Sequence, residues 1–439
     1  MAMAMHRTAA DEPLFPKDID VKVPPISSET SVRYDCDIMY VRALRTGDEQ
    51  HTDQTFTANT GAYPASALQS CVMDDSVKVW PVNHSPSPEK QTRGKATASE
   101  GRPAHFPHRI WAACDFEAQT PDYAWFGTGE TKDIPAYPGN RTSLLAGSGG
   151  QRSALKGGMN PVPGPMMGRE NKLYLRYFLH GATEGTFQHF SLTTEDNNHI
   201  QVSGLTNDKW SELTLNFSRD AVRNDGTPGV PFKEGERMDD FQLYTGAPTA
   251  RDCRLLLDDV IFFSDDPALP PEKEPFPNRV IFLAAFDTGT DAAPRKKYWP
   301  GEYPILTEKT GAPAGSYWGV ARAIPRKDAK GKWLRLPIDP PKPAGALTKV
   351  RFRAHVSKAA PLTVQIFDAT DQDNRHVRTA ALPAGEWTTQ YADLTAGKRN
   401  DGSNTPFAAG HLVDDLFFFL DDTDAELHLD EVVLYDAGR

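Results

Sequence analysis

KLYLRYFLHG at residues 172–181 and RLLLDDVIFF at residues 254–263 open and close a block that the chain contains twice. The second block opens with KVRFRAHV at 349–356 and closes with LHLDEVVLYD at 427–436. Matched landmarks keep nearly the same spacing: Trp210 and Trp387 are 177 positions apart, and two Asn-Asp-Gly turns are 176 positions apart. So small a drift indicates one folding unit that was duplicated and then edited in its loops.

The repeat also includes a leading strand, because RIWAACDFE at 109–117 is matched by RVIFLAAFD at 279–287. Short apolar runs separated by turn residues, at this spacing, are typical of a β-sandwich. We therefore predict an all-β fold with two tandem jelly-roll β-sandwich domains. The predicted boundaries are a largely irregular N-terminal region with few short strands at 1–105, sandwich domains at 106–266 and 279–439, and a Pro-rich linker at 267–278.

Composition narrows the classes of partner. The 48 Lys and Arg residues against 59 Asp and Glu give a net charge of -11, which argues against nucleic acid or an anionic membrane surface as a partner. No apolar run is long enough to predict a membrane span. The cysteines form no CxxC motif, and a Cys36–Cys71 disulfide stays open.

Alternation along the strands predicts which side chains face the core. Val350, Phe352 and Val356 share one side of their strand, so the intervening Arg351, Arg353 and His355 point outward. The same register applied to the other strands gathers Arg, His, Gln and aromatic groups on one outer face of each copy. The predicted ligand-binding residues of this face are Tyr174, Arg176, Phe178, His180, Gln188, Phe190, Arg351, Arg353, His355 and Gln365, with Trp125 and Trp299 added from the divergent loops.

Such a face suits a sugar, because an aromatic ring stacks on the apolar side of a pyranose while Arg, Gln and His donate hydrogen bonds to hydroxyls or carboxylates. The alternative is a face that does not bind a ligand because loops, the other copy or the N-terminal segment cover it. The sequence leaves both interpretations open.

Paired acids recur at the ends of the first and last strands of each copy, in FE or FD and in LDDV or LDEV. On these residues the chain resembles the galactose-binding-like jelly-roll superfamily, which contains many carbohydrate-binding modules of secreted polysaccharide-degrading enzymes. The resemblance spans both modules and implies a structural Ca²⁺ in each, since oxygen ligands suit a hard cation. The implied ligands are Glu117 with Asp258 and Asp287 with Asp430; the alternative is plain solvated acids at strand ends.

We therefore expect non-catalytic binding of a polysaccharide by an extracytoplasmic bacterial protein, as part of a larger secreted assembly. Arg176, Arg351 and Arg353 leave room for an anionic polymer. One alternative is a polysaccharide lyase in which Tyr174 or His180 moves the proton and Arg176 with Gln188 neutralises a uronate. A second alternative is a structural spacer in a surface assembly.

Overall fold

The computed structural model describes residues 101–438 apart from short gaps and the longer stretches 118–129, 223–234 and 288–302; before residue 101 it describes the strands alone. The chain forms two compact units, one of residues 1–91 with 160–162 and one of the remainder. In the first unit β1 (Ser31–Tyr34) pairs with β4 (Tyr63–Pro64) and β5 (Val79–Pro81), and β2 (Tyr40–Arg42) pairs with β3 (Thr55–Thr57). No helix among the described residues is long and apolar enough to cross a membrane.

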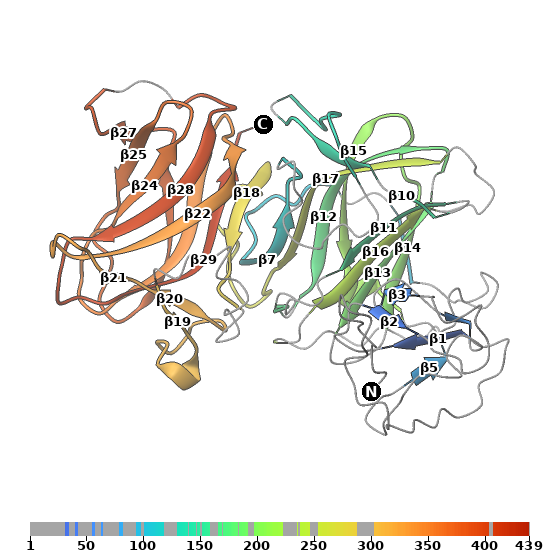
Figure 1. Cartoon of the computed structure of the whole chain (residues 1–439), viewed down its shortest axis with the longest axis horizontal. Helices are drawn as coiled ribbons and strands as arrows, with labels where there is room; N and C mark the ends of the chain where they lie inside the picture. The colour runs from blue at the N-terminus through green and yellow to red at the C-terminus, as the bar shows by residue number, and fades with distance from the viewer. Residues whose placement is uncertain are drawn as a thin grey trace, which may run out of the picture. The chain divides into compact units, whose positions relative to one another are not determined.

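The second unit contains two β-sandwiches, so the predicted all-β fold is confirmed (Figure 1). The first sandwich has one sheet in the order β10-β11-β16-β13-β14-β6 and an opposing sheet β15-β12-β17-β9-β8, with β7 also paired to β17. A single helical turn, α1 (Phe217–Asp220), follows β15. The strands are β6 (Gly94–Thr97), β7 (Arg109–Cys114), β8 (Glu130–Lys132), β9 (Ser143–Leu145), β10 (Gly147–Gly149), β11 (Arg152–Gly158), β12 (Lys172–His180), β13 (Glu184–Ser191), β14 (Asn197–Ser203), β15 (Trp210–Asn216), β16 (Met238–Thr245) and β17 (Arg254–Ser264).

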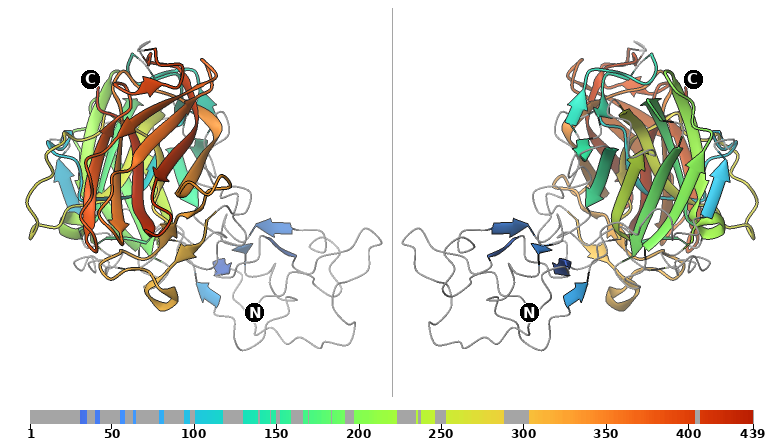
Figure 2. Two further views of the ribbon diagram at one scale, coloured as in Figure 1. Left: turned by 90° about the vertical axis from the view of Figure 1, so that its left-hand side faces the viewer. Right: turned by 90° about the vertical axis from the view of Figure 1, so that its right-hand side faces the viewer.

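The second sandwich repeats this plan. One sheet has the order β19-β20-β29-β23-β26 with β18 paired to β29, and the other has the order β21-β22-β28-β24-β25-β27. The strands of this second sheet face the viewer in the left panel of Figure 2. The strands are β18 (Arg279–Ala284), β19 (Ile305–Leu306), β20 (Val320–Arg322), β21 (Ile324–Pro325), β22 (Lys332–Pro343), β23 (Thr348–Val356), β24 (Thr363–Asp368), β25 (Asp373–Arg378), β26 (Trp387–Asp393), β27 (Lys398–Arg399), β28 (Leu412–Leu420) and β29 (Leu427–Asp436).

The predicted inward faces are correct. Leu173, Leu175 and Leu179 of β12 belong to the core of the first sandwich, and Val350 and Phe352 of β23 belong to the core of the second. Alternation along a strand is therefore enough to place the core, because successive side chains point to opposite faces of a sheet.

The closing strand is irregular at the same place in both sandwiches. The pairing of β12 with β17 shifts register between Tyr174 and Arg176, and the pairing of β23 with β29 shifts between Arg351 and Arg353. Beside these bulges the backbone takes positive φ angles, 48° at Asp259 and 45° at Glu431. Because a bulge interrupts alternation, neighbouring acids of one strand, Asp258 with Asp259 and Asp430 with Glu431, are all buried.

A third apolar cluster, besides the two cores, joins the two sandwiches. Phe106, which lies between β6 and β7, packs on Tyr435 of the second sandwich with ring centroids 4.9 Å apart. Phe276, 170 positions later, packs on Tyr174 of the first, also at 4.9 Å. We call the region around this cluster the junction; its fully enclosed members are Phe106, Ile110, Tyr174, Ile261, Phe263, Phe276, Val280, Val433 and Tyr435.

The junction is reciprocal: equivalent positions of each copy contact the other copy. The leading segments meet where His105 forms an isolated antiparallel bridge with Pro275, and the Phe106 backbone N–H donates to the Glu274 carbonyl at 2.7 Å. Such two-way exchange of one surface is the geometry of an isologous dimer interface. Here both halves of that interface lie in one chain.

Candidate functional site

The predicted outer face divides between two sheets. Tyr174, Arg176, Arg351 and Arg353 lie on the sheets that meet at the junction, whereas Gln365 lies on β24 of the opposite sheet. Tyr174, Arg176 and Arg351 are 0, 5 and 1% exposed. Other segments of the chain cover these three residues: Phe276 and Asn278 of the linker contact Tyr174 and Arg176, and His108 of the first copy contacts Arg351. The predicted grouping of Arg351 with Gln365 on one face was wrong, because β23 and β24 belong to opposite sheets of the second sandwich.

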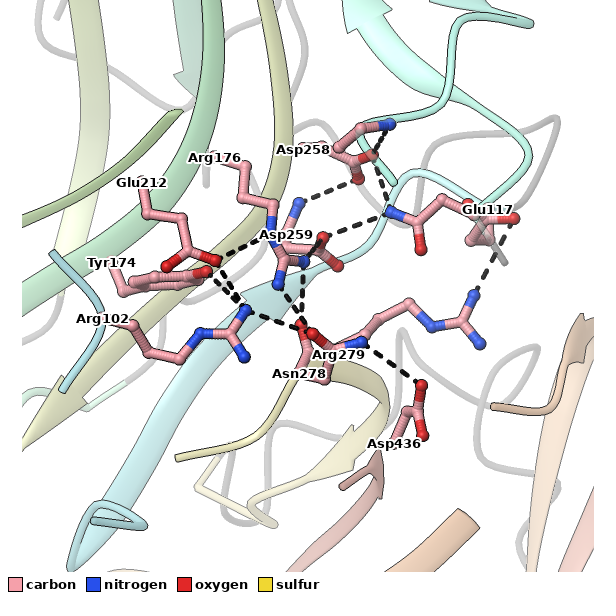
Figure 3. Close-up of polar contacts among 12 residues, drawn as sticks. Arg102, Glu117, Tyr174, Arg176, Glu212, Asp258, Asp259, Asn278, Arg279 and Asp436 are labelled. Carbon is pink, nitrogen blue, oxygen red and sulfur yellow. Dashed lines mark hydrogen bonds and ion pairs between the residues drawn. The ribbon is translucent and has the colours of Figure 1, made fainter. Parts of the chain in front are cut away.

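Arg176 is held in the junction by groups of the first copy and by Asn278 of the linker (Figure 3). Its guanidinium forms an ion pair with Asp259 and donates to the Asn278 carbonyl at 2.9 Å and to the Asn278 side-chain oxygen at 2.8 Å. Its charged end also lies 4.2 Å from the centre of the Tyr137 ring. Arg176 therefore fixes the linker to the first sandwich and has no open ligand surface.

Tyr174 is similarly committed. Its hydroxyl accepts a hydrogen bond from the Arg102 guanidinium at 3.1 Å, and burial raises the pKa of the phenol far above its usual range. A phenol whose pKa is raised this far stays protonated, so it cannot act as the base. Gln188, the other group of the predicted lyase set, lies on β13 in the opposing sheet. The structure does not bring the lyase residues together.

The arginines of the second copy have the same role. Arg351 lies 3.3 Å from a Glu431 carboxylate oxygen and donates to the His108 carbonyl of the first copy at 2.8 Å. Arg353 pairs with Asp430 at 2.9 Å, and its guanidinium lies 4.2 Å from the Tyr317 ring centre. Both cations are neutralised inside the protein.

The four predicted metal ligands are bound by N–H donors. Glu117 accepts from the backbone N–H of Arg141 at 2.8 Å, and Asp258 accepts from the Asn140 side chain at 2.8 Å. Asp287 forms an ion pair with Arg109 at 2.6 Å, and Asp430 accepts from Arg353 and from the Tyr317 backbone N–H; Arg279 lies 3.9 Å from Glu117.

Burial determines the direction of the pKa shifts of two of these acids. Desolvation raises the pKa of Glu117 and of Asp430 to about 7 in each case, although arginine neighbours oppose the shift. Asp430 Oδ1 has no hydrogen-bond partner among the described residues, so one oxygen is available to a cation. The surroundings argue against bound Ca²⁺, because guanidinium groups already lie beside three of the four carboxylates. Ca²⁺ therefore stays a prediction, and the contacts favour arginine in its place.

The remaining predicted residues are more scattered. Phe178 packs edge-on against Trp210 at 6.1 Å, and His180 forms an exposed contact with Asp208 at 2.6 Å. His355 lies between Trp387 and His428, with ring centroids at 5.5 and 5.9 Å. Trp125 and Trp299 lie outside the described residues, and the side chains of Gln188 and Phe190 are not described.

An aromatic surface lies on the far sheet of the second sandwich, where β22, β28 and β24 run side by side. Trp333 is paired in register with Phe419, and Phe417 lies two residues before Phe419 on the same strand. The three ring centroids are 5.9–6.3 Å apart, and the ring planes differ by 11–12°. Three nearly equal separations exclude a single column of rings, so Trp333, Phe417 and Phe419 form a patch, which we call the aromatic face.

The sequence places this patch on the outside for a simple reason. Leu334 and Leu336 of β22 and Leu416, Phe418 and Leu420 of β28 are buried in the core, so the residues between them point the other way. All three rings are only partly buried. The alternating KWLRL and LFFFL runs carry this signal, but the predicted outer face was built from other strands of the repeat.

Polar groups border the aromatic face. Arg335 forms a two-point ion pair with Asp415 at 2.8 and 3.0 Å, and Gln365 donates to the Asn374 side-chain oxygen at 2.9 Å. Gln365 is paired in register with Phe417. The predicted ligand residue Gln365 is therefore placed beside aromatic rings, though on a different face from the one predicted.

One further cluster contains side chains of the types that bind metal ions. Asp368, Asp371 and His411 are the acidic or histidine side chains, within the described part of the chain, whose ligand atoms lie within 4.8 Å of one another. Arg375 and Arg399 lie 3.2 and 3.1 Å from the same Asp371 oxygen. These cations already neutralise the group.

Comparison with known proteins finds likeness in solved structures alone. No family model matches, and no curated protein matches significantly. The CBM22-1–CBM22-2 tandem domain of Xyn10C from Paenibacillus barcinonensis is 14% identical over 76% of this chain and 99% of its own, with a TM-score of 0.27. The structure of TmCBM61 with β-1,4-galactotriose is 10% identical over 31% of this chain and 82% of its own, with a TM-score of 0.21.

A glycoside hydrolase family 43 arabinoxylan arabinofuranohydrolase from Bacillus subtilis is 11% identical over 70% of this chain and 66% of its own, with a TM-score of 0.22. The chain is thus similar to carbohydrate-binding modules and to a glycoside hydrolase. Scores this low do not transfer the ligands of those proteins to this chain.

Proposed function

We propose that this protein binds a polysaccharide without cleaving it, through the aromatic face of the second sandwich. The observation that carries the proposal is the partly exposed patch of three near-parallel rings, Trp333, Phe417 and Phe419. Aromatic rings that present an apolar surface beside planar polar groups suit the apolar side and the hydroxyl edge of a sugar ring.

The position of the patch also suits a polymer. The rings lie across two neighbouring strands in the interior of a six-stranded sheet, and all three are partly exposed. An extended chain can cross such a surface and continue beyond it at both ends. This role belongs to an extracytoplasmic protein that works in a larger secreted assembly.

The test is a glycan array with the full chain, followed by affinity measurements on the best polymer. Trp333→Ala and Phe417→Ala should each weaken binding by about tenfold or more, equivalent to about 1.4 kcal/mol. Phe178→Ala, at a ring on the other sandwich, is the matched control and should bind like the parent. Unchanged affinity in Trp333→Ala and Phe417→Ala, with melting temperatures preserved, would remove the aromatic face as the site.

A further inference from the structure

Charge around the aromatic face is balanced locally. Arg335, whose guanidinium lies 6.0 Å from the Phe417 ring centre, is paired at two points with Asp415. Arg326, 5.3 Å from the Phe419 ring centre, lies 2.7 Å from Asp328 and 3.5 Å from Asp421. Each arginine that borders the rings therefore has a carboxylate partner, so neither offers uncompensated charge.

The neighbouring positions do not add positive charge to the patch. Arg378 lies 3.8 Å from the same Asp421. Lys398 is exposed, but it lies on edge strand β27, separated from β28 by β24 and β25. At the other end of the face, burial raises the pKa of Asp414, and the carboxylates of Asp415 and Asp339 add to the rise while Arg335 opposes it.

We propose that the aromatic face selects an uncharged polysaccharide and discriminates against uronate or sulfated polymers. This inference rests on the proposed function and names its substrate class. A hydroxyl group both donates and accepts hydrogen bonds, so the Arg335–Asp415 pair and the Gln365–Asn374 pair each offer it a matching donor and acceptor. A ligand carboxylate would gain no net attraction from a neutralised arginine and would be repelled by Asp415.

The three arginines that could have attracted an anionic polymer are used elsewhere. Arg176, Arg351 and Arg353 are paired with Asp259, Glu431 and Asp430 in the junction. The anionic polymer that these arginines suggested from the sequence therefore loses its support, since each of the three guanidinium groups already pairs with a carboxylate.

The experiment compares uncharged polymers with uronate and sulfated polymers by affinity electrophoresis at low and high salt. The expected result is retention by an uncharged polymer, little affected by salt because no ion pairs form with the ligand. Retention by uronate or sulfated polymers alone would overturn the substrate class while leaving polysaccharide binding intact. Retention by no polymer would overturn the proposed function itself, and the inference with it.

A gain-of-function variant makes the test sharper. Asp415→Asn removes the negative charge that pairs with Arg335 at two points and that would repel an anionic ligand, so uronate polymers should gain affinity by about tenfold or more at low salt, and the gain should fall at high salt. Asp328→Asn is the matched control, because Arg326 keeps Asp421 as a partner. If Asp415→Asn, with a cooperative melt, gains no salt-sensitive uronate binding, local charge balance does not set selectivity and the inference fails.

Discussion

Arg109 and Asp287 belong to different sandwiches and form an ion pair of 2.6 Å that Arg279 and Glu117 repeat with the copies exchanged. The two arginines are 170 positions apart, and so are the two acids. The second contact is longer, at 3.9 Å, and Glu117 also accepts from backbone N–H groups. Equivalent residues of the two copies therefore form the same kind of contact twice, once in each direction. These contacts hold the two sandwiches together as a single structural unit.

Breaking the Arg109–Asp287 pair should be costly because both side chains are 4% exposed. We expect Asp287→Ala to lower the free energy of unfolding by about 3–5 kcal/mol, since Arg109 would remain buried without its closest partner. Denaturant unfolding measures the change. Asp220→Ala, which breaks an exposed pair with Arg219, is the control and should cost less than about 1 kcal/mol; equal losses in the two variants would contradict the buried role.

Arg176→Ala and Trp333→Ala should have opposite effects. Arg176→Ala should lower the melting temperature, because it leaves Asp259 without its ion pair and Asn278 without two hydrogen bonds, yet the folded protein should keep its affinity for the polysaccharide. Trp333→Ala should keep the melting temperature of the parent and lose affinity for the polysaccharide. Thermal melts and affinities measured below both transitions decide the matter, and loss of binding in folded Arg176→Ala would return the site to the junction.

Sequence reasoning recovered the duplication, the all-β fold and the inward faces, because these depend on local alternation and on spacing within one chain. It did not separate the sheets: β23 and β24 are consecutive in sequence but belong to opposite layers, so Arg351 and Gln365 face opposite directions. Nor could alternation tell solvent from a second sandwich, since both lie outside the core. The polar, aromatic composition of the β12 and β23 faces is explained by the segments that cover them: Phe276 packs on Tyr174, and Arg351 donates to the His108 carbonyl.

The acids at the strand ends show the same limit. Their recurrence was visible in the sequence, and so were Arg109 and Arg279 at the start of each leading strand. The sequence did not predict that Arg109 and Arg279 each contact the acid of the other copy. That relation is a property of the junction, and a resemblance to single modules does not predict it.

Stability should fall as pH rises from about 6.5 to 8. The folded-state pKa of both Glu117 and Asp430 is raised to about 7, so each holds its proton more tightly in the folded chain than in the unfolded one. That stabilisation is complete below the unfolded pKa and is lost as pH passes through 7. His428, whose pKa is lowered to about 4, acts in the opposite direction only below about 6.5.

Melting temperatures between pH 6.5 and 8 test this, with Asp430→Asn as the comparison. The variant cannot ionise at that position, so its melting temperature should depend less on pH. A melting temperature that rises across this window in the parent would contradict the expected loss of stability.

Chelation tests the predicted Ca²⁺. Because Arg109, Arg279 and Arg353 already lie beside Asp287, Glu117 and Asp430, we expect excess chelator to leave the melting temperature nearly unchanged. Parallel melts with added Ca²⁺ provide the comparison. A clear fall with chelator that Ca²⁺ reverses would show that a cation, and not arginine alone, holds the first and last strands together.

Binding should have one site per chain, because the copies differ at the aromatic face. The equivalent positions of the first sandwich lie on β11 and β16. Ala154 and Tyr244 are paired there as Trp333 and Phe419 are in the second sandwich. Lys156 and Gln242 likewise correspond to Arg335 and Phe417. One aromatic residue at these positions does not make a three-ring patch. Titration with a short oligosaccharide should therefore give one ligand per chain, and Tyr244→Ala should bind like the parent while Phe419→Ala should not. Two equivalent sites, or loss of half the sites in Tyr244→Ala, would show that the first sandwich binds as well.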